Sequence, residues 1–200
     1  MSAAAIELDR QAAVWAERGH PLAPATLDAL GTALPDDATD EPTRERVPFV
    51  LVVPDAVRPA ASAMAQTQLG GKVGSVNQHA GDIDEFTPIE SVAVPVTDAY
   101  LLVDVVRGSE FCGTAPEPAV ATLTERGRTP LTVAEGLALV ALNPEMLEKN
   151  HCFSLAGSRN GDRRVPAIWI NKGAPHLGWC FAGVPHSWLG MASAGGRTAG

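Results

Sequence analysis

Apolar residues near the amino terminus recur with the spacing of an amphipathic helix. In the stretch from residue 3 to residue 18 they are Ile6, Leu8, Ala12, Val14 and Trp15. This spacing predicts a helix that ends at Gly19, and a second, shorter helix is expected over 25–33. The acidic segment 35–46 has no apolar period, so we expect a solvated loop whose composition allows flexibility.

Two apolar runs in the middle of the chain predict strands. Residues 47–53 (VPFVLVV) are mostly β-branched or aromatic and precede Pro54, which is typical of a strand buried on both faces. Residues 99–108 (AYLLVDVVRG) have the apolar character and the alternation of a second strand. Weaker strand patterns occupy 70–76 and 91–96.

Two Thr-x-x-Glu motifs predict a central pair of helices. The sequences TAPE (114–117) and TVAE (132–135) have the form of capping boxes. In such a box the hydroxyl and the carboxylate bind backbone N–H groups that the first helical turn leaves free. We therefore expect one helix over 115–126 and another over 132–142.

The last fifty residues change to short strands separated by glycine-containing turns. The runs 152–158, 165–171 and 178–183 predict an antiparallel meander, and 191–200 is expected to be a flexible tail. Strands flank the helical pair, and no repeat or linker interrupts the chain. We therefore expect a single α+β domain over residues 1–200, with a helical N-terminal part, a central helical pair and a C-terminal antiparallel β-meander.

Composition and charge narrow the classes of function. A chain of 200 residues with 46% hydrophobic and 19% charged side chains suits one globular domain. Its net charge of −8 argues against nucleic-acid binding, which needs an excess of Lys and Arg. No apolar run approaches the roughly 18 residues of a membrane helix, and no signal-peptide pattern is present. We expect a cytoplasmic protein that binds no membrane and whose three cysteines are free thiols.

The charge is unevenly distributed along the chain. Residues 1–150 carry 10 basic and 22 acidic side chains, whereas residues 151–200 carry five basic and one acidic. The last quarter also contains three of the four tryptophans and three of the five histidines. Because Trp, Arg and His are enriched at binding surfaces, this segment is where we expect a site. The plainer alternative is that the basic segment folds against the acidic one.

Common cofactor and catalytic motifs are absent from the sequence. No glycine-rich phosphate loop, no HExxH and no GxSxG occurs, so we expect no nucleotide cofactor and no standard hydrolase site. His151 and Cys152 are adjacent, and on a strand they would point to opposite faces. That placement argues against a metal site.

The first candidate binding group lies in one turn between two predicted strands. Its members are Arg159, Asp162, Arg163 and Arg164. Guanidinium groups bind carboxylates and phosphates in bidentate fashion, and Asp162 could hold one of the arginines in place. The alternative is an ordinary hairpin turn whose arginines pair with acids elsewhere in the protein.

The second candidate group is aromatic. Trp169 and Trp179 fall on successive predicted strands and are expected in the core, whereas Trp188, close to His186, is the exposed candidate. In an antiparallel meander the third strand ends at the same edge as the first turn. We therefore expect Trp188 and His186 beside the arginines, two strand spacings or roughly 10 Å away. Lys172 is expected at the opposite edge, outside this site.

Two side chains are candidates for catalysis. Asp104 lies within the apolar run LLVDVV, where a carboxylate is costly to bury unless an arginine or several donors bind it. We expect it to be ion-paired inside the fold, as a structural lock or as a catalytic acid, and both roles remain open. His186 is the other candidate for a general base.

Four strings together resemble a known family. They are RVPFVLVV (46–53), RGRTPLTVAEGLALV (126–140), LEKNHCFSLAGSRNGDRRVPAIWI (147–170) and LGWCFAGVPHSWLG (177–190). The chain resembles an uncharacterised actinobacterial family of single-domain proteins, known only as a domain of unknown function. The resemblance implies one domain in the cytoplasm and no particular activity. It points to these motif-bearing positions: Asn150, Ser154, Arg159, Asp162, Arg163, Trp169, Trp179, His186 and Trp188.

Three functions from different classes follow from these features. The first is recognition of a small anionic or carrier-bound metabolite through a C-terminal rim of Arg, Trp and His. The second is a non-catalytic partner subunit that supports a catalytic protein, for example in natural-product biosynthesis. The third is an independent enzyme with His186 or Asp104 as general base. All three leave homo- or hetero-oligomerisation open, and none requires nucleic acid, a cofactor or a metal ion.

Overall fold

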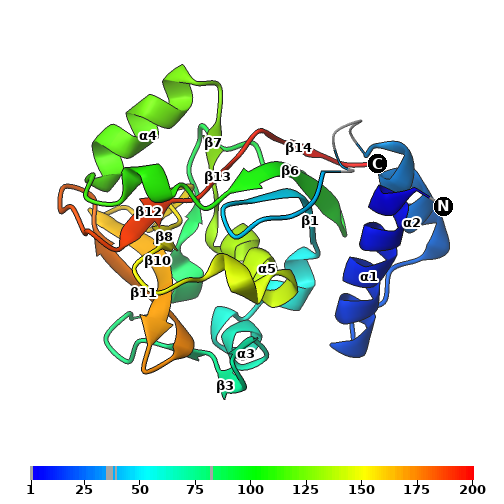
Figure 1. Cartoon of the computed structure of the whole chain (residues 1–200), viewed down its shortest axis with the longest axis horizontal. Coiled ribbons are helices and arrows are strands. Elements are labelled where there is room, and N and C mark those ends of the chain that lie inside the picture. The colour runs from blue at the N-terminus through cyan, green and yellow to red at the C-terminus, as the bar shows by residue number, and fades with distance from the viewer. Residues whose placement is uncertain (1, 35–37, 39, 82) are drawn as a thin grey trace.

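Helices and strands are mixed along the chain, which confirms the α+β class (Figure 1). The computed structural model describes residues 2–34, 38, 40–81 and 83–200. Its helices are α1 (Ala3–Glu17), α2 (Pro24–Thr32), α3 (Ala60–Ala65), α4 (Pro116–Glu125) and α5 (Val133–Leu142). Helices α1 and α2 lie together at one end of the molecule, beside the carboxyl terminus. None of the helices in the described ranges is long and apolar enough to cross a membrane.

The first sheet contains both of the long apolar runs. Its strands are β1 (Arg46–Val52), β6 (Tyr100–Val106), β7 (Thr129–Pro130), β13 (Ser193–Ala194) and β14 (Gly196–Thr198). The order is β1-β6-β13-β7, with β14 also on β6, and every pairing is antiparallel. The two strongest strand predictions, 47–53 and 99–108, therefore pair directly with each other.

The second sheet contains the predicted meander. Its strands are β4 (Ser75–Val76), β8 (Cys152–Ser154), β10 (Arg164–Asn171), β11 (Ala174–Phe181) and β12 (Leu189–Met191), in the order β12-β8-β10-β11-β4. Strands β8, β10 and β11 are antiparallel as expected, but both edge strands pair in parallel, β12 with β8 and β4 with β11. Two short ladders complete the pairing: β2 (Gln68–Leu69) with β3 (Lys72–Val73), and β5 (Thr87–Pro88) with β9 (Ser158–Arg159).

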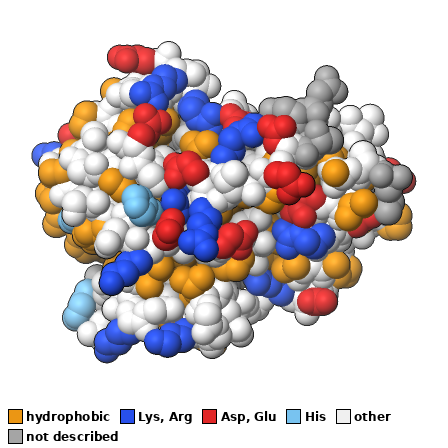
Figure 2. Space-filling view, in the orientation of Figure 1, with side chains coloured by type: hydrophobic (Ala, Val, Ile, Leu, Met, Phe, Trp, Pro, Cys, Tyr) orange, Lys and Arg blue, Asp and Glu red, His pale blue; other side chains and the backbone are white. Residues whose placement is uncertain are grey.

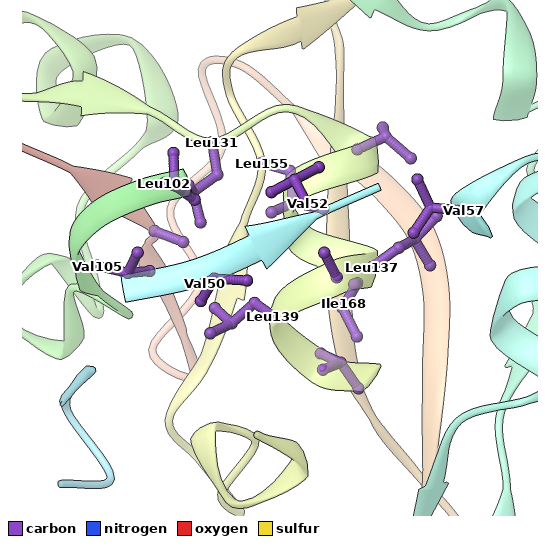
Figure 3. Packing of buried hydrophobic residues seen from close by; sticks show 14 of the residues in the cluster. Val50, Val52, Val57, Leu102, Val105, Leu131, Leu137, Leu139, Leu155 and Ile168 are labelled. Carbon is purple, nitrogen blue, oxygen red and sulfur yellow. The ribbon is translucent and has the colours of Figure 1, made fainter. Parts of the chain in front are cut away.

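Helix α5 is the centre of the core. Its sequence is almost wholly apolar, and eight of its ten residues are buried, as expected of a helix with protein on all sides. It contacts β1 of the first sheet and β10 of the second. Figure 3 shows Val50 and Val52 of β1 meeting Leu137 and Leu139 of α5, with Ile168 of β10 close by. The two sheets are therefore joined through one apolar cluster.

A buried ion pair fixes the amino-terminal end of α5. The carboxylate of Glu135 accepts bidentate hydrogen bonds from Arg197 of β14 at 2.5 and 2.7 Å, and it also accepts from the backbone N–H of Thr132 at 2.7 Å. The hydroxyl of Thr132 in turn accepts from the backbone N–H of Glu135, so the predicted capping box at 132–135 is confirmed. Tyr100 of β6 donates to the same carboxylate at 3.0 Å. Burial, reinforced by Glu135, raises the pKa of Tyr100, which keeps the phenol protonated as a donor.

Three sequence expectations are corrected by the structure. Residues 191–200 were expected to be a flexible tail, but β13 and β14 pair with β6 and bring Arg197 to Glu135. The capping box at 114–117 does not form, because Pro116 begins α4 and leaves Ala115 as its cap, without a side-chain hydrogen bond. Residues 91–96 contain no strand. Of the expected loop over 35–46, residues 35–37 and 39 lie outside the described ranges, and 40–45 contain neither helix nor strand.

We predict that Arg197→Met lowers the free energy of unfolding by about 3–5 kcal/mol, because it leaves the fully buried carboxylate of Glu135 without its counter-charge. Urea unfolding at neutral pH measures the change. The control is Arg126→Met, whose partner Glu110 is exposed, so its loss should cost at most about 1 kcal/mol. Equal stabilities for the two variants would contradict the role given to the buried pair.

Candidate functional site

Tight turns carry lysines at one end of the second sheet. Lys172 lies in the hairpin turn between β10 and β11, where its φ of 51° and the φ of 85° at Gly173 fit a type I′ turn. Lys149 lies in another turn, closed by the bridge between Glu148 and His151, in which Asn150 also has a left-handed φ of 69°. Both turns therefore project their lysines beyond the ends of the strands.

The two turns line one cavity of about 560 Å³. Its wall contains Lys149, Asn150 and Lys172 together with Trp188 and the apolar side chains Leu69 and Ile170. Lys72, in the β2–β3 hairpin, is not part of this wall, but its Nζ donates to the backbone oxygen of Lys172 at 2.7 Å. These are all the lysines in the sequence. We call this space the lysine cavity.

All three lysines are exposed. Among the described residues, none of the three has a carboxylate within salt-bridge distance. The arginines differ sharply, since eleven of the twelve donate to a carboxylate or to a backbone oxygen. Those eleven are Arg10, Arg18, Arg44, Arg46, Arg107, Arg126, Arg128, Arg159, Arg163, Arg164 and Arg197. Figure 2 shows basic and acidic side chains interleaved across the middle of one face.

Strand register explains why Trp188 reaches the lysine cavity and not the arginine turn. Strand β8 is antiparallel to β10, so it begins beside the end of β10 that leads to Lys172. Strand β12 pairs in parallel with β8, and its first residue, Leu189, lies opposite Cys152, the first residue of β8. Trp188 directly precedes Leu189 and is therefore brought back to the lysine end of the sheet. The expectation that Lys172 lies away from Trp188 is wrong, because both line the same cavity.

The predicted arginine group does not converge on a single point. Arg164 binds Asp162 at 2.6 Å, and its guanidinium lies over the rings of Trp179 and Phe86. Asp162 thus holds an arginine in place, as the sequence suggested. The acid also caps the turn by accepting from the backbone N–H of Arg164 at 2.7 Å.

The other two arginines of the turn point elsewhere. Arg163 is exposed and forms a long contact of 3.5 Å with Glu117 of α4. Arg159 is half-buried and donates to the backbone oxygens of Ala156 and Ser158 at 2.7 and 2.9 Å. Burial lowers its pKa. Arg163 therefore pairs with an acid elsewhere in the protein, as the alternative expected, whereas Arg159 binds backbone oxygens.

Four aromatic side chains on the second sheet and in the segment after it form a connected group: Trp169, His176, His186 and Trp188. The ring of Trp188 lies 5.3 Å from that of His186 and 6.0 Å from that of Trp169, which in turn lies 5.0 Å from His176. Trp169 and Trp179 pack against the core as expected, and Trp188 does so too. All three are half-buried, so the expectation that Trp188 would be the exposed one is wrong. The structure therefore brings His186 and Trp188 together, as the sequence predicted.

Asp104 is ion-paired, as its sequence context predicted. Its two carboxylate oxygens accept from Arg46 at 2.6 Å and from Arg128 at 2.5 Å. Burial alone would raise the pKa of Asp104, but the two arginines outweigh it and hold the pKa below its usual value. Both oxygens are occupied by cations that belong to the fold, which favours the role of a structural lock.

The cysteines do not provide an activated nucleophile. All three are free thiols, and burial raises the pKa of each. Cys152 lines the lysine cavity, but its thiol donates to the backbone oxygen of Glu148 at 3.4 Å. Within the described ranges, no cluster of three His, Cys, Asp or Glu side chains could hold a metal ion.

Comparison with known proteins identifies the family to which the chain belongs. The model of a family of unknown function (DUF5701) matches residues 13–200, which include every part of the lysine cavity. The chain belongs to the DUF5701 family. The resemblance to an uncharacterised family is thereby confirmed. No curated protein and no solved structure matches this DUF5701 chain.

We predict that Asp104→Asn lowers the free energy of unfolding by about 2 kcal/mol at pH 7, because two arginines lose a partly buried counter-charge. The folded pKa is lowered, so the stabilisation is present above the unfolded pKa of about 3.9 and is lost as pH falls through the folded pKa. Urea unfolding between neutral and acidic pH should show the two proteins converging below about pH 4. A control, Asp9→Asn at an exposed helix position, should match the parent throughout. A difference that persists undiminished in acid would contradict this account.

Proposed function

We propose that the protein binds a small anionic ligand in the lysine cavity. The observation that carries the proposal is that a chain of net charge −8 places two of its three lysines in the wall of one cavity, and the third donates to the backbone of one of them. Among the described residues, none of the three has an acidic partner. Lys149 and Lys172 come from separate turns and Lys72 comes from strand β3, so only the fold brings them close together. A phosphate or carboxylate group is the chemistry that such a group of ammonium ions fits.

Electrostatics supports this location over the arginine turn. Two unit charges about 4 Å apart interact by about 1 kcal/mol even in water, so neighbouring unpaired ammonium groups gain from a shared anion. The chain is acidic overall, which disfavours anions over most of the surface and favours a place where basic side chains gather without acidic partners. The arginines of residues 159–164 are already bound to Asp162, Glu117 or backbone oxygens.

The neutral walls suit a ligand larger than a bare ion. Trp188 and Ile170 offer apolar surface beside the lysines, and Asn150 offers an amide. Cavities of this size, with apolar walls and a few polar groups, are typical of small-molecule sites. The proposal therefore keeps the ligand class that the sequence favoured, a small anionic or carrier-bound metabolite. The proposed anion-binding side chains are lysines, whereas the sequence analysis expected arginines.

Binding has better support than catalysis. Asp104 is neutralised by Arg46 and Arg128, so it is poorly suited to act as a general base. His186 has no carboxylate within salt-bridge distance in the described part of the chain to orient its ring. A role as partner subunit remains the alternative proposal, and the cavity itself does not favour it.

We predict that the protein binds pyrophosphate and that Lys172→Gln weakens this binding about fivefold at low ionic strength, as expected for the loss of one exposed ion contact. Isothermal titration calorimetry with sodium pyrophosphate measures the affinity, which should fall as salt is raised. The matched control is Arg58→Gln, which removes the same charge from an exposed side chain outside the cavity.

Two outcomes would contradict the proposal. One is an absence of pyrophosphate binding to the parent protein. The other is an equal loss of affinity in Lys172→Gln and Arg58→Gln, since that would mean that only net charge matters. Retained affinity in Arg58→Gln with a loss in Lys172→Gln places the anion at the lysine cavity.

A further inference from the structure

A second cavity shares Trp188 with the lysine cavity. It measures about 310 Å³, and its wall contains Trp169, Trp179, Phe181, Val184, His186 and Trp188. None of its described lining residues is Lys, Arg, Asp or Glu, in contrast to the neighbouring cavity with its two lysines. We call it the aromatic cavity. Trp188 therefore lies between the lysine cavity and the aromatic cavity.

The rings next to Trp188 support one another before any ligand arrives. The ring of Trp188 lies 6.0 Å from that of Trp169 and 5.3 Å from that of His186. Trp169 lies opposite His176 in the strand register, whereas Trp179 lies opposite Pro166, so the indole of Trp179 points to the other face of the sheet. A rigid wall loses little side-chain entropy when a ligand binds, which favours affinity.

Two exposed apolar side chains lie at the same cavity. Phe181 is 50% exposed and Val184 is 43% exposed, although side chains of this kind are usually covered. Both contribute to the wall. Their exposure places apolar surface where a ligand that extends from Trp188 would cover it.

We propose that the ligand is an aromatic anion whose phosphate or carboxylate binds Lys149 and Lys172 and whose flat ring occupies the aromatic cavity. Trp188 contacts both parts, because it lines both cavities. An aromatic body fits better than an alkyl chain, since rings gain edge-to-face and stacked contacts with the surrounding tryptophans beyond the area they bury. This inference rests on the proposed function and adds the chemical class of the ligand.

Four probes separate the two parts of the ligand: inorganic phosphate, 2-naphthyl phosphate, octyl phosphate and 2-naphthol. Calorimetry should show 2-naphthyl phosphate binding about tenfold or more tightly than inorganic phosphate, with a smaller gain for octyl phosphate. 2-Naphthol, which lacks the anion, should bind more weakly than 2-naphthyl phosphate. Lys172→Gln should weaken both 2-naphthyl phosphate and inorganic phosphate by the same factor.

Variants of the aromatic cavity give the decisive comparison. Phe181→Ser should remove most of the tenfold gain of 2-naphthyl phosphate and leave inorganic phosphate binding unchanged. Val184→Ser provides the same test if Phe181→Ser fails to fold. Val96→Ser is the matched control, because Val96 is fully exposed and lines neither cavity.

The outcomes distinguish this inference from the proposed function. If neither inorganic phosphate nor pyrophosphate binds, the proposed function fails. If they bind but 2-naphthyl phosphate binds no more tightly than inorganic phosphate, only the aromatic inference fails. The inference is equally overturned if octyl phosphate matches 2-naphthyl phosphate, or if Phe181→Ser and Val184→Ser leave the gain intact.

Discussion

The buried ion pair between Glu135 and Arg197 joins the carboxyl-terminal strand β14 to the central helix α5. Glu135 lies in the first turn of the central helix α5, and Arg197 lies on β14. The pair excludes solvent almost completely, and Tyr100 and Thr132 complete the hydrogen bonds of the carboxylate. Taking two charges out of water costs several kcal/mol for each ion. The pair is stable because each carboxylate oxygen of Glu135 accepts two hydrogen bonds. Helix α5 then presents its apolar faces to both sheets.

The position of the lysine cavity follows from this arrangement. Residues 189–198 leave the second sheet at β12 and enter the first at β13 and β14, where the ion pair secures them. Strand β12 is parallel to β8. The chain must therefore run from the end of β11 at Phe181 back to the start of β8 before β12 can pair with β8. This return brings Trp188 to the turns that carry Lys149 and Lys172. Core geometry and candidate site thus depend on the same carboxyl-terminal segment.

Much of the fold could be predicted from the sequence, because the patterns that indicate its helices and strands are local. The apolar runs at 47–53 and 99–108, the capping box at 132–135 and the three-stranded meander all depend on neighbouring residues, and each is confirmed. Asp104 could be predicted as ion-paired because an acid in an apolar strand has few other options. The partners themselves, Arg46 and Arg128, lie far away in sequence, and nothing local identifies them.

The candidate site was harder to predict, because it depends on contacts between residues that are far apart in the sequence. The arginines at 159–164 looked like an anion site in sequence, but Asp162 and Glu117 lie close enough in space to bind two of them. Lys149 and Lys172 are 23 residues apart, and only the fold brings them to one cavity and Lys72 to the backbone of Lys172. A weak signal was present in the sequence, since the lysines stand in GGK, EKN and NKG, which are turn-forming contexts that leave a side chain exposed. Their rarity in a chain rich in arginine was the second such signal.

The most direct measurement is a crystal structure of the protein grown with sodium tungstate, a phosphate analogue whose tungsten is located by anomalous scattering. The account predicts an anomalous peak between Lys149 and Lys172, next to Trp188. A peak at the arginine turn of residues 159–164, or no peak at the lysine cavity at tungstate concentrations that saturate binding in solution, would contradict it.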